Sequence, residues 1–304
     1  MPNDVVKRGS LFDPKLVTDL IDRVKGTSAL AALCGQTPIP FNGLKEFTFS
    51  MDDEVDLVAE SGKKSRGHMA LDPVTIMPVK IEYGARTSDE FIYATEEEKI
   101  EVLKSFNEGF AKKAAKGLDI MAFHGVNPRT NEEAELIGTN CFDKKVTQTV
   151  AAGGSETADA KIEAAIAMVS ANEEDVSGMA MSTMLRDALA AMTKQSGEKM
   201  YPELAWGSKP GNINGLPVAV NSTVGKSITR DGSEISTDLG IVGDFASGFK
   251  WGYAKEIPME IIKYGDPDNS GRDLKGHNEI YIRCEMYLGW GILIPSAFAR
   301  ILAE

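Results

Sequence analysis

A short acidic stretch, GDPDNSGRDLKGH, contains the side chains best suited to binding a metal ion. Asp266, Asp268 and Ser270 occupy positions one, three and five of a calcium-binding loop, and Gly271 occupies position six. The twelfth position, which should be a glutamate, is His277, and the flanking residues are typical of strands rather than helices. A solvated turn between two strands is the favoured interpretation. We therefore assign no metal ligands, and a weak ion site stays open.

A small cationic stretch, AESGKKSRGHMAL, interrupts a chain whose formal net charge is -12. Lys63, Lys64 and Arg66 lie among glycine and serine residues, as they would in a phosphate-binding loop. The motif does not fit, because Leu57 stands where its first glycine should be and Lys64 where its hydroxyl residue should be. A sequence pI near 4.9 also argues against a surface for duplex nucleic acid, which needs clustered basic residues.

The residue patterns of common enzymes do not occur in the sequence. It contains no G-x-S-x-G nucleophile elbow, and GWGILI lacks the third glycine of a dinucleotide-binding turn. Only His68, His124 and His277 could serve as a histidine base. His124 ends the longest predicted helix, where it would interact with the helix dipole, and His68 lies in a glycine-rich segment without rigid support. We predict no enzymatic activity, no catalytic residue and no cofactor.

The composition is that of an ordinary globular protein, with 304 residues of which 42% are hydrophobic and 26% are charged. No run of about 18 apolar residues occurs, and the first residues lack the apolar segment of a secretory signal, so membrane insertion and Sec export are not expected. Cys34, Cys141 and Cys284 are far apart and odd in number. They predict neither a disulfide framework nor a zinc site, but three small buried residues.

The predicted elements change type several times along the chain. We expect a helix over 14–34 with a break around Gly26, and a long helix over 95–124 in which apolar residues step by three or four. Between them, residues 38–86 should form short strands, with runs at 47–51, 55–59 and 74–86. The cationic stretch lies at the tip between two of the strands. Residues 151–250 then alternate helices and strands, with helices over 159–170 and 182–197.

The last third of the chain returns to strands, and NEIYIRCEMYLGWGIL shows a regular alternation. Ile280, Ile282, Cys284, Met286 and Leu288 would be buried, and the intervening Tyr281, Arg283, Glu285 and Tyr287 would lie on the polar face. No internal repeat of about 20 to 50 residues occurs, which excludes solenoids and propellers.

Five stretches of the sequence occur in an informative order: FAKKAAKGLDIMAFHGVNP, MAMSTMLRDALAAMTKQSGEKMY, NINGLPVAVNSTV, VGDFASGFKWGYAKEIPMEI and YIRCEMYLGWGILIPSAFARI. Together with the order of elements, they resemble the major capsid proteins of tailed phages, which have the Hong Kong 97-type fold. The first is similar to the end of that family's long spine helix, the second to its strand, helix and turn, and the last to its terminal strand.

This resemblance implies an α+β fold with a long spine helix, a β-rich peripheral domain, an α/β axial domain and an extended loop. The implied divisions are an N-terminal arm and helix at 1–54, the extended loop at 55–85, a peripheral domain at 86–150 and 255–304 with its spine helix at 95–124, and an axial domain at 151–254.

The resemblance also implies a function. The chain would be a major capsid protein that self-assembles through hexamers and pentamers into the icosahedral shell around the genome of a tailed double-stranded DNA phage. It would assemble in the host cytoplasm without contacting a membrane, and would enclose DNA without binding a specific sequence. Portal, decoration and scaffolding proteins are the implied partners. The N-terminal segment is too short for a cleavable scaffold, so we expect a separate scaffolding protein or an earlier cleavage.

Within such a shell, Gly62, Lys63, Lys64, Arg66 and His68 would form the tip of the extended loop and contact a neighbouring subunit. A long two-stranded arm is only marginally stable alone in water, and the adjacent subunit would provide a surface for it. The positive charges would steer the tip onto an acidic neighbour. Some members of the family crosslink a lysine of this loop to an asparagine, but the sequence identifies no acceptor here.

Two other functions are compatible with the sequence. An encapsulin-type compartment has a similar fold but packages enzymes rather than DNA. A soluble metal-dependent α/β enzyme could instead use the acidic loop at 266–277.

Overall fold

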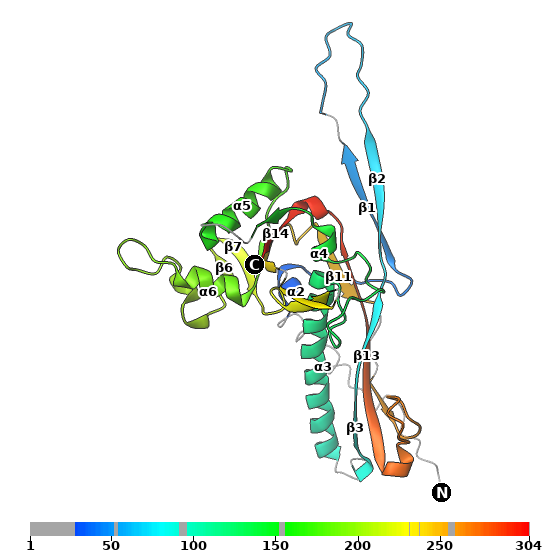
Figure 1. The fold of residues 1–304 in the computed structure, drawn as a ribbon. Helices are drawn as coiled ribbons and strands as arrows, with labels where there is room; N and C mark the ends of the chain where they lie inside the picture. Colours follow the sequence, from blue (N-terminus) through cyan, green and yellow to red (C-terminus); the bar gives the residue numbers. More distant parts are fainter. Residues whose placement is uncertain are drawn as a thin grey trace.

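The computed structural model describes residues 28–51, 54–90, 96–151, 156–230, 232–236, 238–254 and 259–303. Its architecture is mixed α+β, with a central body from which a long helix and a long hairpin project in different directions (Figure 1). Most of the helix expected over 14–34 lies outside the described residues. The described part is α2 (Ala29–Leu33), a short helix that is followed by Cys34.

The long helix α3 covers Glu96–His124, which is 29 residues. At about 1.5 Å per residue it is roughly 43 Å long. The helix predicted over 95–124 is thus confirmed, although residue 95 lies outside the described part of the chain. The helix ends before Gly125, whose φ of 70° lies in the left-handed region that glycine adopts without strain. Its buried side consists mainly of small and medium apolar residues, including Phe110, Ala111, Ala114, Ala115, Leu118, Met121 and Ala122.

A four-stranded sheet is built around one long strand, β13 (Glu279–Ile292). β3 (Val79–Ser88) pairs antiparallel with one of its edges, and β12 (Met259–Ile262) and β11 (Phe249–Tyr253) pair antiparallel with the other. The sheet lies beside α3 in Figure 1. The predicted alternation along β13 is confirmed, since the side chains expected inside are all buried: Ile280, Ile282, Cys284, Met286 and Leu288.

Tyr281 departs from this alternation. It was expected on the polar face, but only 9% of its surface is exposed. Its ring lies over Gly84 of β3, where an added Cβ would be 2.0 Å from Tyr281 Oη. Because Gly84 has no side chain, the Tyr281 ring can lie across β3. This contact removes most of the ring from solvent.

A second sheet contains six strands in the order β4-β14-β10-β5-β7-β6. Helices α5 (Ala158–Ser170) and α6 (Thr183–Ala191) share a hydrophobic core with it. The helix predicted over 159–170 is confirmed. The strands are β4 (Thr149–Val150), β14 (Phe298–Leu302), β10 (Asp238–Gly243), β5 (Gly178–Met181), β7 (Leu216–Val220) and β6 (Asn212–Ile213), and a separate hairpin pairs β8 (Ser227–Arg230) with β9 (Ser233–Ser236).

The helix predicted over 182–197 is shorter in the structure. It begins as expected, because Ser182 Oγ accepts a hydrogen bond from the Leu185 N–H at 3.2 Å, but it ends at Ala191. Gly197, with a φ of 83°, belongs to a tight turn after the helix. The glycine that was expected to end the helix therefore serves this turn.

Two strands pair with a sheet other than the one expected from the predicted domain ranges. β11 falls within the predicted axial range, 151–254, but pairs with β13 of the four-stranded sheet. β14 falls within the predicted peripheral range, 255–304, but pairs with β10 and β4 of the six-stranded sheet. The two sheets thus exchange strands near the end of the chain, and the domain ranges stay a prediction.

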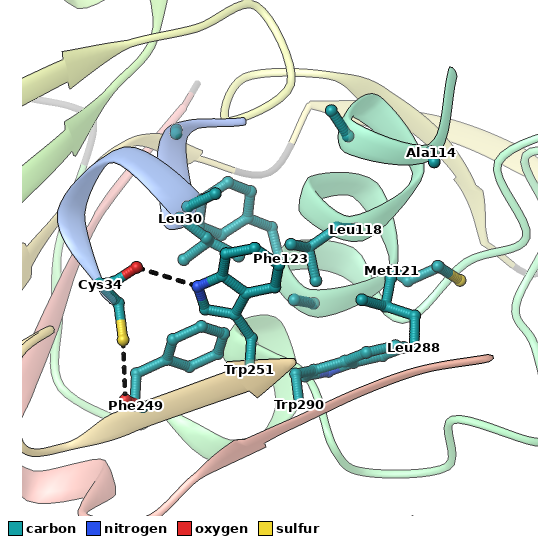
Figure 2. Packing of buried hydrophobic residues seen from close by; sticks show 14 of the residues in the cluster. Leu30, Cys34, Ala114, Leu118, Met121, Phe123, Phe249, Trp251, Leu288 and Trp290 are labelled. Atoms are coloured by element: carbon teal, nitrogen blue, oxygen red, sulfur yellow. Dashed lines mark hydrogen bonds between the residues drawn. The ribbon is translucent and has the colours of Figure 1, made fainter. Parts of the chain in front are cut away.

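The main hydrophobic core joins α2, α3 and the four-stranded sheet (Figure 2). Trp251 and Trp290 are almost fully buried in it, and Trp251 Nε1 donates a hydrogen bond to the Cys34 carbonyl at 2.9 Å. Cys34, Cys141 and Cys284 are all buried and none of the three forms a disulfide, as predicted. Burial raises the pKa of Cys34 to about 11 and that of Cys284 to about 12, so both stay protonated.

The projecting hairpin consists of β1 (Leu44–Met51) and β2 (Met69–Ile76), which pair antiparallel throughout. We call residues 44–76 the arm. Its distal part, 54–68, contains no helix or strand, so the strand expected at 55–59 is wrong. That segment alternates like a strand, but the structure gives it no neighbour with which to form a ladder.

Candidate assembly interface

The arm carries an apolar surface on one side. Its register places Phe47 opposite Pro73, Phe49 opposite Leu71, and Met51 opposite Met69. Residues directly opposed in an antiparallel pair lie on the same side of the ribbon. All six are exposed. We call this surface the apolar face of the arm, and its members are Phe47, Phe49, Met51, Met69, Leu71 and Pro73.

The other side of the arm is more polar. Glu46, Thr48 and Asp72 lie there, and Thr48 Oγ1 donates to the Asp72 carbonyl at 3.2 Å. The ribbon is thus amphipathic, although it packs on the body only at its base. Contiguous exposed apolar patches of this kind mark interaction surfaces in soluble proteins.

The base of the arm is firmly attached to the body. Ile76 is fully buried, and it lies so close to β13 that a Cβ on Gly291 would be 2.7 Å from its Cγ1. Lys250 Nζ also lies 2.7 Å from Glu46 Oε1, which ties β11 to β1. The body therefore fixes where the arm starts, and the rest of the arm projects away from the body (Figure 1).

The five residues predicted for the tip lie together in the segment that joins β1 to β2. Gly62, Lys63, Lys64, Arg66 and His68 are all exposed, and Gly62 N–H closes a turn by donating to the Ala59 carbonyl at 2.8 Å. The segment forms the end of the arm farthest from the body (Figure 1). Their contact with a neighbour stays a prediction.

Sequence reasoning missed the apolar face. The signal was present, because apolar residues alternate in FTFSM and again in MAL, but two alternating strands only form one face when their register is known. The three cationic residues stand out in the sequence because the chain is acidic. The apolar face contains more residues than this cationic group.

The acidic loop considered as a calcium site is organised around an arginine. Arg86 of β3 donates through Nη2 to Asp266 Oδ1 at 2.7 Å and to Ser270 Oγ at 2.6 Å, and through Nε to Asp268 Oδ2 at 2.9 Å. Arg86 Nη1 also donates to Glu279 Oε2 at 2.8 Å. The three side chains at loop positions one, three and five do converge, but on a guanidinium group.

The ionisation of this cluster follows from its geometry. The hydrogen bond from Arg86 lowers the pKa of Asp268 well below its usual range, and the same bond keeps the pKa of Arg86 raised. A positive charge therefore already occupies the centre of the loop. The turn interpretation is favoured over the calcium site that the sequence left open.

A second group of possible metal ligands is buried at the end of α3. Ligand atoms of His124, Asp143 and Asp238 lie within 4.8 Å of one another. Arg300 of β14 lies among them: its Nε donates to both oxygens of Asp238 at 3.1 Å, and its Nη2 donates to Asp143 Oδ1 at 3.0 Å. Arg300 thus supplies the cation, and the group acts as a buried ion-pair network.

The network joins several elements. His124 Nε2 donates to the Thr223 carbonyl at 2.8 Å, and its Nδ1 lies 3.2 Å from Asp143 Oδ2. Burial raises the pKa of Asp238 to about 7, with Asp143 adding to the shift. Burial would also raise the pKa of Asp143, but His124 and Arg300 hold it below its usual value. His124 thus contacts Asp143 and the Thr223 carbonyl, and its predicted interaction with the helix dipole stays a prediction.

The comparisons with known proteins agree with this geometry. The model of the phage capsid family matches residues 9–301. This chain belongs to the phage capsid family. It is similar to a chain in a structure from Mycobacterium phage Ogopogo, with 31% identity, a TM-score of 0.78 and coverage of 91% of this chain and 92% of that chain. No curated protein sequence matches it.

Two further solved structures share the fold of this phage capsid family member. A chain from Gordonia phage Cozz is 22% identical, with a TM-score of 0.72 and coverage of 91% and 87% of the two chains. A chain from the capsid of a native GTA particle computed with C5 symmetry is 13% identical, with a TM-score of 0.64 and coverage of 91% and 90%.

The predicted Hong Kong 97-type α+β fold and the predicted capsid function are confirmed. The chain is a shell protein that assembles into the multimeric capsid of a virion. The comparisons do not favour the encapsulin-type or the metal-dependent enzyme alternative. Among the described residues, no helix combines the length and apolar character that crossing a membrane requires.

Proposed function

We propose that this capsid protein builds the icosahedral head of a tailed double-stranded DNA phage from hexamers and pentamers, and that each subunit lays its arm on a neighbouring copy. It does so as a structural protein without enzymatic activity, in the host cytoplasm. Scaffolding, portal and decoration proteins are its further partners, and the DNA is enclosed without sequence-specific binding.

The observation that carries this proposal is the exposed apolar face of the arm. Each strand of the arm has eight residues. The ribbon is therefore about 27 Å long and roughly 10 Å wide. Docking this face would bury on the order of 540 Å² over both partners, whereas a stable pairwise interface needs about 1,200 Å² or more. One arm contact is too small to hold a dimer, so the contact is suited to an assembly that repeats it many times.

The tip residues support the same arrangement through their charge. Lys63, Lys64 and Arg66 are exposed at the end of an arm whose parent chain has a net charge of -12. The surface of a second copy is therefore, on average, acidic and attracts the tip. Gly62 and His68 complete the predicted contact. Within the shell, residues 151–254 would form the axial domain around the symmetry axes, and residues 86–150 and 255–304 the peripheral domain.

Electron microscopy and sedimentation velocity of the purified protein test the proposal. We expect capsomers or closed shells from the natural chain. A variant in which residues 60–68 are replaced by a glycine-serine segment of equal length leaves β2 and the apolar face intact, and it should keep the circular dichroism and melting temperature of the natural chain but fail to close shells. A chain that stays monomeric, in the presence and absence of co-expressed scaffolding protein, would contradict the proposed function. Normal shells from the replacement variant would contradict only the role of the tip.

A further inference from the structure

One tryptophan is exposed in a way that sets it apart from the other two. Trp251 and Trp290 are buried in the core, whereas Trp206, near the end of η3 (Pro202–Gly207), is fully exposed. Its backbone is left-handed, with a φ of 61° and a ψ of 27°. Bulky side chains rarely adopt this conformation, so the indole is held outward at some conformational cost.

The turn that presents Trp206 is fixed on both sides. Leu204 is fully buried in the core of the six-stranded sheet. On the other side, the Gly207 carbonyl accepts a hydrogen bond from Arg186 Nη1 at 3.2 Å, and Ser208 N–H donates to the Ala205 carbonyl at 3.2 Å. Trp206 is thus displayed by a defined turn rather than by a loose segment. A rigid, amphipathic side chain displayed in this way loses little entropy on binding.

The surroundings of the turn indicate a protein partner. η3 packs on α6, where Met184 is also exposed. The charges nearby have both signs, with Glu203 and Lys209 exposed beside the turn and Asp187 exposed on α6. Single-stranded nucleic acid also stacks on aromatic residues, but it requires a positively charged groove. An apolar anchor with a mixed polar rim is instead typical of a contact between proteins.

We propose that the Trp206 turn is a contact between copies of this chain in the assembled capsid, separate from the arm. The inference rests on the proposed assembly, which supplies a second copy as the partner. The mixed charge of the rim suits contact with a copy that carries the same charges. In Figure 1, α6 lies at the left of the body, whereas the arm leaves the body on its right and projects upward, so the two surfaces would engage different neighbours.

Fluorescence tests this proposal directly, because the two buried tryptophans provide an internal reference. In free subunits, acrylamide should quench the long-wavelength emission of Trp206 and leave that of Trp251 and Trp290. In DNA-free shells or capsomers, we expect the emission to shift to shorter wavelength and the quenchable component to disappear. Equal quenching in free and assembled protein would overturn the proposal. So would protection that develops only when DNA is present.

Two variants at the same position separate folding from assembly. Trp206→Gly should leave the melting temperature unchanged or higher, because glycine adopts the left-handed backbone freely, yet raise the critical concentration for assembly by about tenfold. Trp206→Phe should restore most of the assembly. Assembly of the glycine variant at the natural concentration would refute the contact while leaving the proposed function intact. If the natural chain itself never assembles, that result would contradict the proposed function, and with it the Trp206 contact.

Discussion

Phe49 and Leu71 lie directly opposite each other across the arm, with 57% and 58% of their surfaces exposed. They mark the centre of the apolar face. Because both side chains are more than half in water, they contribute little to the stability of the isolated subunit. Their large apolar surface is available to a partner.

Replacing this pair by serine, in a Phe49→Ser/Leu71→Ser variant, should separate folding from assembly. The free energy of unfolding should change by no more than about 0.5 kcal/mol, as at other exposed sites. Each arm contact should lose about 2 kcal/mol, roughly a 30-fold weakening, which light scattering during assembly would measure. The matched control, Thr48→Ala/Asp72→Asn, changes the other side of the arm and should assemble normally. Equal defects in both variants would show that the apolar face is not the contact surface.

Reversing the charge of the tip should affect the rate of assembly more than its end point. We expect a Lys63→Glu/Lys64→Glu/Arg66→Glu variant to assemble more slowly, most of all at low salt, because charges are screened beyond about 10 Å at 0.1 M salt. A variant with glutamine at the same three positions should show an intermediate rate. Rates that match the natural chain at every ionic strength would mean that these charges are only solvated.

Asp119 should be one of the most sensitive positions for folding. It is fully buried on α3 and accepts hydrogen bonds from Ser28 Oγ, from Ala29 N–H at 2.9 Å and from Thr223 Oγ1 at 2.8 Å. Asp119→Ala would leave these donors without a partner and should lower the free energy of unfolding by at least about 3 kcal/mol, measured by urea denaturation. Thr223→Val, which removes one donor, should cost about 1 kcal/mol. A smaller loss for the alanine variant would mean that water replaces the carboxylate.

The Asp238 carboxyl should make stability depend on pH between about 4 and 7. Its pKa is raised from 3.8 to about 7 in the folded chain, so the folded state holds a proton that the unfolded state releases. Stability from this group is therefore present at low pH and lost as the pH rises through 7. As the pH rises across this range, the melting temperature of the natural chain should fall relative to that of Asp238→Asn, which cannot lose the proton. A constant difference would mean that Asp238 does not hold this proton in the folded chain.

Removing Arg86 should turn the acidic loop into a site that responds to calcium. Arg86→Ala leaves the carboxylates of Asp266 and Asp268 without their cation, while Glu279 keeps its ion pair with Arg272 at 2.7 Å, and the change should lower the melting temperature. Added calcium should recover part of that loss in the variant and have no effect on the natural chain. Stabilisation of the natural chain by calcium would show that the ion displaces or joins Arg86.

The elements that could be predicted from the sequence are those whose pattern is local. Over residues 102–116, α3 buries one side, and β13 alternates from Ile280 to Leu288 apart from Tyr281, so in these stretches the periodicity determines both the type of element and its inner face. The order of elements and the five resembling stretches then predicted the fold family. The error at 55–59 also has a local cause, because an alternating pattern cannot show whether a partner strand exists.

The features that could not be predicted depend on pairing between distant residues. The apolar face needs the register of two strands. The Arg86 cluster joins residues about 180 positions apart, and the network of Asp143, Asp238 and Arg300 spans a similar distance. The residues adjacent to Arg86 and Arg300 in the sequence do not indicate which acidic side chains surround each arginine. These partners are set by the packing of the sheets.

The attachment of the arm has a mechanical consequence. β2 continues into β3 after Met77 and Pro78, and β3 is paired with β13 from Val79 to Ser88. A neighbour that pulls on the arm along its length therefore loads this whole ladder in shear, and its hydrogen bonds, which run perpendicular to the strands, share the force. Pulling one pair apart at a time would need far less force. The continuity of β2 with β3 therefore transmits tension from the arm to the body through the β3–β13 ladder.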